Sequence, residues 1–218
     1  MQKKLGNVFN TFHTLYFQSR SLRRSCRRVP SIAAFLSGVS LPVNAPDAVS
    51  VDLGCGPSPK NPFEAANVIG VDIISGQNSS TLLADLCFDG IPLPPSSVNF
   101  CTAHDFIEHV PRMARLGSAT VFPFVNLMNE VFRVLEPGGL FLSSTPAYPS
   151  KQAFQDPTHV NIITEDTFPL YFCSESHSEG SLMASMYGFA GDFVMLDQAW
   201  VHDAWLVTLM ASKKSPDL

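Results

Sequence analysis

Short apolar runs, most of them ended by a turn residue or an acid, recur along the first two thirds of the chain. Residues 49–53 read Val-Ser-Val-Asp-Leu, and residues 68–73 read Val-Ile-Gly-Val-Asp-Ile. Runs that are rich in β-branched residues and poor in polar ones are typical of strands buried on both faces of a parallel sheet. The pattern predicts strands at 49–53, 68–73, 81–86, 97–103 and 139–145.

A different period follows residue 118. Apolar residues there recur every three or four positions, which predicts a helix over 118–135 with one buried face. That face consists of Val121, Phe124, Val125, Met128, Val131, Phe132 and Leu135. A shorter helix is expected at 164–172, and the segments 192–196 and 204–211 predict two strands that form a closing hairpin.

Strands that alternate with helical segments predict an α/β fold with a mostly parallel sheet. The first connection between strands is unusual. It spans residues 57–67 and contains Pro57, Pro59 and Pro62, which leaves little room for a regular crossover helix. We therefore expect a shortened or irregular first crossover.

The end of the first strand carries Gly54-Cys55-Gly56, and the second strand carries an acid, Asp72, at its end. Glycines allow a sharp turn and a close approach of a ligand to the backbone. An acid at the end of the neighbouring strand is placed to hydrogen-bond ribose hydroxyls. A phosphate cradle is disfavoured, because Pro57 and Pro59 have no N–H groups to donate. The motif indicates a nucleoside site without a pyrophosphate loop.

Three further segments follow in order: Thr81–Leu86, Val98–His109 and Phe132–Leu142. The second contains a Glu-His pair, and the third reads Arg-Val-Leu-Glu-Pro-Gly-Gly near its start. Together with the glycine loop, these segments resemble the class I S-adenosylmethionine-dependent methyltransferases, in their type 11-like branch. The resemblance covers roughly residues 49–145.

This resemblance implies a three-layer Rossmann-like fold, with a seven-stranded, mostly parallel sheet and an antiparallel last strand. It also implies S-adenosyl-L-methionine as the cofactor. The cofactor-binding residues it implies are Asp52, Gly54, Cys55, Gly56, Asp72, Ile73, Asp85, Leu86 and His104. Two of them have alternative interpretations: Asp52 could orient the loop or the cofactor's ammonium group, and Asp85 could simply stabilise a turn.

For acceptor chemistry, the candidate catalytic residues are Asp105, His109 and His159. Asp105 follows the fourth strand, where open α/β sheets place ligands. His109 could instead cap a helix or hold a loop. His159 lies in an Asp-Pro-Thr-His turn after the fifth strand, where the fold builds its acceptor wall. No cluster has the sequence spacing of a zinc site, so no metal site is predicted.

Charge divides the chain into two regions. Residues 1–28 hold seven basic residues and no acid, whereas the rest holds seven basic residues against all 19 acidic ones, a net charge of −12. We therefore expect a basic N-terminal extension over 1–46 and a methyltransferase domain over 47–218. Leu5, Phe9, Phe12, Leu15 and Tyr16 recur at helical spacing, which favours a lid helix. An Arg-rich mitochondrial targeting segment and an anion-binding arm remain alternatives.

Composition narrows the function further. No apolar run is long enough to cross a membrane. Five cysteines without a C-x-x-C pair favour free thiols and a cytoplasmic protein, with a mitochondrial location as the alternative. The acidic domain disfavours nucleic acid as a partner. We expect methyl transfer to a small-molecule or glycan-like acceptor, at oxygen. A catalytically silent binding module, or a nucleic-acid or protein methyltransferase, are the alternatives.

Overall fold

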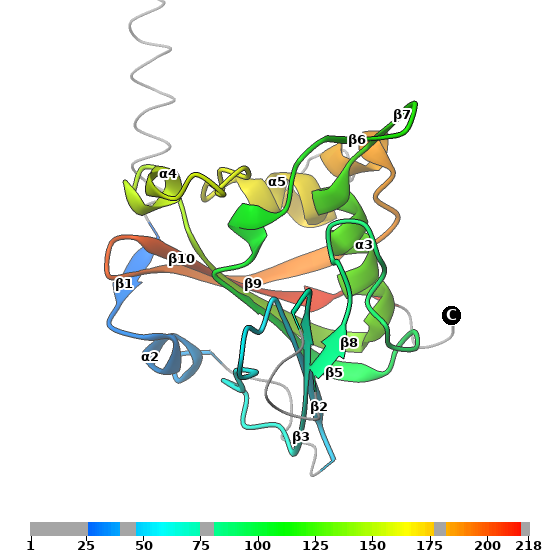
Figure 1. Cartoon of the computed structure of the whole chain (residues 1–218). Helices are drawn as coiled ribbons and strands as arrows, with labels where there is room; N and C mark the ends of the chain where they lie inside the picture. The colour runs from blue at the N-terminus through cyan, green and yellow to red at the C-terminus, as the bar shows by residue number, and fades with distance from the viewer. Residues whose placement is uncertain (1–25, 40–46, 75–80, 177–181, 215–218) are drawn as a thin grey trace, which may run out of the picture.

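The computed structural model describes residues 26–39, 47–74, 81–176 and 182–214, which form one eight-stranded sheet with helices on its two faces (Figure 1). The order across the sheet is β1-β9-β10-β8-β5-β2-β3-β4. The strands are β1 (Arg27–Val29), β2 (Val49–Leu53), β3 (Asn67–Asp72), β4 (Thr81–Leu83), β5 (Val98–His104), β8 (Leu135–Pro146), β9 (Phe193–Val201) and β10 (Trp205–Ser212). A separate hairpin consists of β6 (Ala114–Leu116) and β7 (Ala119–Val121).

The direction of the strands confirms the predicted fold class. Strands β4, β3, β2, β5 and β8 run parallel to one another, and β10 is antiparallel to both β8 and β9. The seven predicted strands are present, but the sheet has an eighth. Strand β1 pairs in parallel with β9 at the edge, and it belongs to the segment that the sequence predicts as an extension.

Helices cover the two faces unequally (Figure 1). On one face, α3 (Pro123–Val134) and α5 (Thr167–Phe172) pack over a large apolar cluster. On the other face, the short helix α2 (Ile32–Leu36) and the loop that carries Phe63 cover a smaller cluster. The remaining helical turns are α4 (Gln152–Gln155), η1 (Ile107–His109), η2 (Ser174–Ser176) and η3 (Met183–Tyr187).

Several predicted boundaries change. The predicted third strand ends at Leu83 and not at 86, and the predicted short helix begins at Thr167 and not at 164. The helix predicted from residue 118 begins at Pro123, because residues 114–121 form the β6–β7 hairpin around Gly117, whose φ is +61°. The predicted shortening of the first crossover is complete: residues 54–66 contain turns and no helix. Phe63 fills the place of a helix side chain by stacking on Phe100, with ring centroids 4.4 Å apart.

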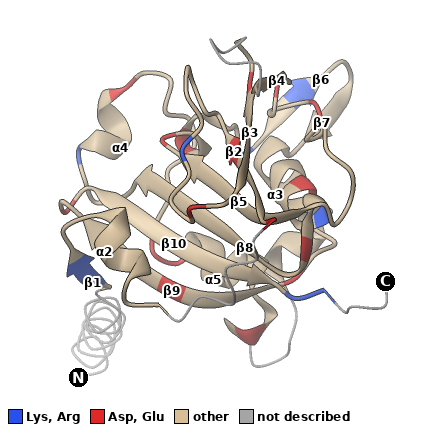
Figure 2. Cartoon of the chain, turned by 90° about the horizontal axis from the view of Figure 1, so that it is seen from below, with Lys and Arg blue, Asp and Glu red and all other residues tan. Residues whose placement is uncertain are grey.

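Two arginines of the basic block form ion pairs at the edge of the sheet. Arg27 pairs with Asp197 of β9 and Arg28 pairs with Asp203 of the β9–β10 turn. Figure 2 shows β1 as a basic strand beside β9. The other five basic residues of this block, and the apolar positions of the predicted lid helix, lie outside the described residues. In the described part of the chain, no helix is long and apolar enough to cross a membrane.

Helix α2 is expected to be an essential part of the core, although it comes from the predicted extension. Phe35 is fully buried, so Phe35→Ala should lower the free energy of unfolding by about 3–5 kcal/mol. Phe154 is 56 % exposed, and Phe154→Ala serves as the matched control, with an expected loss below about 1 kcal/mol. Urea denaturation measures both. An equal, small effect of the two substitutions would show that α2 does not pack as described.

Candidate functional site

The glycine loop turns at the carboxyl end of β2. Gly54 and Gly56 have φ of +62° and +59°, values that side chains disfavour. The Gly56 N–H donates to Oδ2 of Asp72 at 2.8 Å, which joins the ends of β2 and β3. An ideal Cβ on Gly54 would lie 2.3 Å from the Phe106 ring, whereas one on Gly56 would meet open space. The loop therefore packs on the protein at Gly54 and is open at Gly56.

Asp52 holds the returning part of this loop. It is 1 % exposed, its Oδ2 accepts from the Lys60 N–H at 2.8 Å, and its Oδ1 accepts from the Thr102 hydroxyl at 2.6 Å. Burial raises the pKa of the Asp52 carboxyl. Of the two roles predicted for Asp52, this geometry favours orientation of the loop.

Asp72 lies beside an exposed apolar surface. Its Oδ1 accepts from the Ile74 N–H at 2.9 Å, so each carboxylate oxygen holds one backbone amide. A carboxylate has about four lone-pair positions, and about two remain for a ligand. The side chains that follow are unusually exposed: Ile73 is 66 % and Ile74 is 72 % exposed. This edge offers a carboxylate next to an apolar platform.

The other predicted cofactor contacts near β4 are engaged within the protein. Oδ1 of Asp85 accepts from the Cys87 N–H, and its carbonyl accepts from the N–H groups of Phe88 and Asp89. Leu86 is 5 % exposed and packs in the core. Cys55 is 7 % exposed, and burial raises the pKa of its thiol. The structure thus brings Asp85 into a turn, the alternative that the sequence left open.

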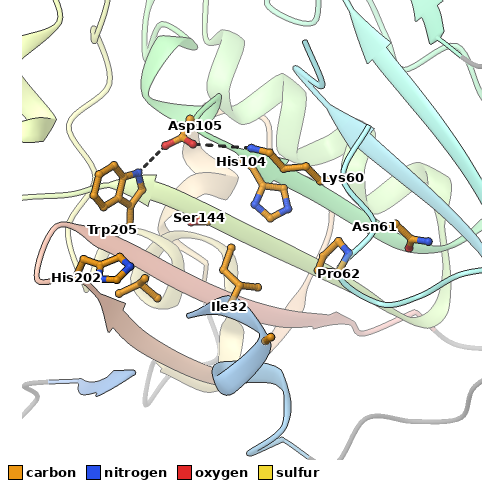
Figure 3. Close-up of a pocket in the computed structure, with 11 residues that line it drawn as sticks. Ile32, Lys60, Asn61, Pro62, His104, Asp105, Ser144, His202 and Trp205 are labelled. Atoms are coloured by element: carbon orange, nitrogen blue, oxygen red, sulfur yellow. Dashed lines mark hydrogen bonds and ion pairs between the residues drawn. The ribbon is translucent and has the colours of Figure 1, made fainter. Parts of the chain in front are cut away.

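A cavity of about 590 Å³ opens beyond the loop, at the carboxyl ends of β5 and β8 (Figure 3). Its walls come from α2, residues 60–62, and the β9–β10 turn. His104 lines it, is 6 % exposed, and has an Nε2 atom without a partner among the described residues. Burial lowers the pKa of His104 to about 4, so the ring is neutral at physiological pH.

A pair of opposite charges lies at the mouth of this cavity (Figure 3). The Lys60 Nζ lies 3.9 Å from Oδ2 of Asp105, and the Trp205 indole N–H donates to Oδ1 of Asp105 at 2.6 Å. Asp105 has a φ of +50°, which carries the chain sharply away from the end of β5. The sequence analysis missed Lys60 and Trp205, because they follow a loop and a hairpin turn that no motif marks.

A second polar group, the Glu-His-His cluster, consists of Glu108, His109 and His159. One ligand atom from each residue lies within 4.8 Å of the others. Glu108 is 1 % exposed, accepts from the Thr145 hydroxyl at 2.6 Å, and has a pKa that burial raises to about 7. The two imidazoles meet edge to face, with centroids 4.8 Å apart. The structure therefore joins two predicted catalytic histidines with a carboxyl that the sequence analysis did not single out.

Gly54 and Gly56 provide a matched pair of substitutions. Gly54→Ala adds a steric clash with Phe106 to the unfavourable positive φ, whereas Gly56→Ala adds only the backbone cost, about 1–2 kcal/mol. We expect Gly54→Ala to destabilise the protein clearly more than Gly56→Ala in urea denaturation. Equal losses would mean that Phe106 does not pack on the loop.

The neutral His104 predicts a dependence of stability on pH. Its folded pKa lies below the usual histidine value of about 6.5, so the unfolded chain binds the proton more readily between about pH 6.5 and pH 4. The contribution of His104 to stability should therefore fall as the pH falls through this window, by about 2 kcal/mol between about pH 7 and pH 5. Other groups with shifted pKa values, such as Glu108, are common to the parent and to His104→Gln, so the difference in unfolding free energy between the two, measured by urea denaturation, should change by this amount. Exposed His202 is the control, and a His104→Gln profile parallel to the parent would contradict the assignment.

Comparison with known proteins identifies the fold. No protein-family model and no curated protein matches the sequence. The YcgJ protein from Bacillus subtilis matches with a TM-score of 0.54 and 12% identity over 84% of this chain and 98% of that one. An S-adenosylmethionine-dependent methyltransferase from Aquifex aeolicus matches with a TM-score of 0.52 and 14% identity, over 84% of this chain and 90% of that one. The [4+2]-cyclase SpnF matches with a TM-score of 0.52 and 12% identity, over 77% of this chain and 75% of that one. Together with the sheet order, these matches show that the chain has the fold of the class I S-adenosylmethionine-dependent methyltransferases.

Proposed function

We propose that this protein is an S-adenosylmethionine-dependent methyltransferase. The observation that carries the proposal is the junction of the glycine loop with Asp72, next to exposed Ile73, at the carboxyl ends of β2 and β3. In this arrangement the lone pairs left on Asp72 accept from the ribose hydroxyls, and the adenine packs on Ile73. Gly56, where a Cβ would meet only open space, allows the ligand to approach the backbone.

The cavity near His104 suits the amino-acid end of the same cofactor as a binding site. That end carries a carboxylate and an ammonium group, and Lys60 and Asp105 offer the complementary charges 3.9 Å apart. His104 borders them as a neutral ring with an unpartnered Nε2. We assign Lys60 to the cofactor carboxylate and Asp105 to the ammonium group, while Trp205 orients Asp105.

The reaction needs position more than proton chemistry. The acceptor oxygen attacks the methyl carbon in line, the carbon–sulfur bond breaks, and its electron pair stays on sulfur as a neutral thioether. A hydroxyl acceptor also loses its proton, and a nearby base accelerates this step by about 10²–10⁴-fold. His109 and His159 are the candidate bases on the acceptor side, whereas Asp105, the third residue predicted as catalytic, is assigned to the cofactor's ammonium group.

We propose a small-molecule or glycan-like acceptor that is methylated at oxygen. The sequence beyond residue 28 has a net charge of −12, which opposes binding to the negative backbone of a nucleic acid. A catalytically silent binding module is the second candidate. It is favoured by the internal bonds of Asp52, Asp72 and Asp85, and the match to a [4+2]-cyclase shows that the fold also occurs in a protein described by another reaction.

The role of the N-terminal region is a separate proposal. We propose that residues 1–46 are an N-terminal extension that docks on the methyltransferase domain of residues 47–218 through β1 and α2, and that the first part of this extension closes over the cofactor as a lid. The burial of Phe35 under the sheet supports a close attachment of this extension. A cytoplasmic location is proposed as well, and the mitochondrial alternative predicts that the protein in cells lacks the Arg-rich residues 1–28.

Calorimetry with S-adenosylhomocysteine tests the cofactor site. Asp72→Asn and Lys60→Ala should each weaken binding by about tenfold or more, because each removes a charge-assisted bond worth about 1.5–3 kcal/mol. Lys151→Ala, which removes an exposed cation away from the cavity, should bind like the parent. A parent that binds neither S-adenosylmethionine nor S-adenosylhomocysteine would refute the proposal.

Turnover separates the enzyme from the silent module. Purified protein is incubated with methyl-labelled S-adenosylmethionine and a panel of hydroxylated metabolites and glycans. The enzyme hypothesis predicts label in at least one acceptor, and loss of that label in Lys60→Ala at low cofactor concentration. Tight cofactor binding without transfer to any acceptor would support the silent module instead.

A further inference from the structure

We propose that the Glu-His-His cluster of Glu108, His109 and His159 binds a divalent transition-metal cation of the zinc class. One ligand atom from each residue lies within 4.8 Å of the others at the carboxyl edge of the sheet. Two imidazoles and a carboxylate suit zinc and its neighbours, whereas magnesium and calcium prefer oxygen ligands alone.

The hydrogen bonds around His109 prepare its ring as a ligand. The Thr158 hydroxyl donates to Oδ1 of Asp156 at 2.6 Å, so the Thr158 oxygen is left to accept from Nδ1 of His109 at 3.0 Å. The proton therefore resides on Nδ1, and the lone pair resides on Nε2. Ligating histidines commonly donate their other ring nitrogen in this way.

His159 supplies an unsatisfied nitrogen. Its Nδ1 is buried and has no partner among the described residues. A buried ring nitrogen without a hydrogen bond is unfavourable, and a cation would satisfy it without a change of fold. The edge-to-face contact with His109 brings the two rings together without stacking them.

The backbone holds the two halves of the cluster together. The carbonyl of Glu108 accepts from the N–H groups of Val160 and Asn161, both at 2.9 Å, and Asn161 donates to the carbonyl of Ile107 at 3.1 Å. Thr145 fixes the Glu108 carboxyl from β8. The residues on the two sides of the cluster are therefore fixed relative to each other before any ligand arrives.

The electrostatic surroundings favour a cation. Asp105 and Asp156 both act on the cluster, while Arg112, the nearby cation, is bonded to Oδ1 of Asn161 and to the carbonyl of Ile162. Zinc–nitrogen bonds of about 2.0–2.1 Å bring ligands to about 3.5 Å from each other. The partly buried rings of His109 and His159 need to move by about 1 Å to reach this separation.

The catalytic use of this site rests on the proposed function, whereas cation binding does not. Three protein ligands leave an open position, which an acceptor hydroxyl can occupy. A bound divalent cation would lower the pKa of that hydroxyl and would replace His109 and His159 as the means of activation, because these two rings would then be its ligands; the hydroxyl proton would pass to water and the oxygen would take the methyl group. Binding of the cation itself does not require that the protein transfers methyl groups.

The test uses the full chain after treatment with a chelator and in the absence of cofactor. Cobalt(II) is titrated and followed by its visible absorption, and zinc is titrated by calorimetry. We expect one cation per chain. His109→Ala and His159→Ala should each weaken binding by at least about tenfold, and Thr158→Val, which removes the bond that orients His109, should do so as well. His202→Ala removes an imidazole outside the cluster and should bind like the parent.

Circular dichroism confirms that each variant folds, and the partly exposed histidines avoid the risk of substituting buried Glu108. A parent that binds no cation in one-to-one ratio overturns the inference. So does binding that survives in the double variant of His109 and His159, or a thiolate charge-transfer band that places cobalt at the cysteines. Binding of S-adenosylhomocysteine is measured alongside: its presence without cation binding refutes this site alone, and cation binding without it refutes the proposed function alone.

Discussion

The backbone of residues 54–66 depends on a small number of side chains, because no helix satisfies its N–H groups. Asp52 accepts from Lys60, Asp72 accepts from Gly56, and Asn61 exchanges two bonds with Ala65. Two of these acceptors are carboxylates at the ends of neighbouring parallel strands. Asp72, which is proposed to contact the ribose, therefore also holds the loop that forms the binding surface, so that the proposed site and the local fold are stabilised together.

This constraint explains how one face of the sheet is completed. A regular crossover helix would cover that face, but here Phe63 from the loop and Phe35 from α2 fill it. The cavity near His104 lies where these two short elements meet the strand ends. Because a loop takes the place of the crossover helix, Lys60 lies next to Asp105, and α2 forms a wall of the cavity. Residues 26–39 and the candidate site are therefore parts of one structure.

Much of the sheet could be predicted, because buried parallel strands leave a strong local pattern. The pattern also predicted the hairpin of β9 and β10 and the face of α3. Strand β1 was missed because Arg27-Arg28-Val29 has no apolar run, and its place at the edge depends on pairing with β9 and on ion pairs to Asp197 and Asp203. The start of α3 was misplaced because the β6–β7 hairpin continues an apolar spacing that also fits a helix.

The site residues that lie at strand ends could be predicted from the sequence, whereas those that meet only through tertiary contacts could not. Gly54, Gly56 and Asp72 end strands, and their roles in the loop follow from that position. Lys60 reaches Asp105 only through the returning loop, and no spacing rule reveals this contact. His159 lies far along the chain from Glu108 and His109, and the backbone bonds of Val160 and Asn161 bring it to them. Sequence spacing therefore gave no indication that these three side chains lie together.

A crystal structure of the full chain with S-adenosylhomocysteine tests the central claim most directly. The account predicts that the adenine lies on Ile73, that the ribose oxygens are within hydrogen-bond distance of Asp72, and that the amino-acid end lies between Lys60 and Asp105. The loop bonds from Asp52 and Asp72 should persist in the complex. A ligand that occupies another site, such as the apolar cavity of about 380 Å³ beside Phe122 and Tyr171, with the edge of β2 and β3 uncontacted, would contradict it.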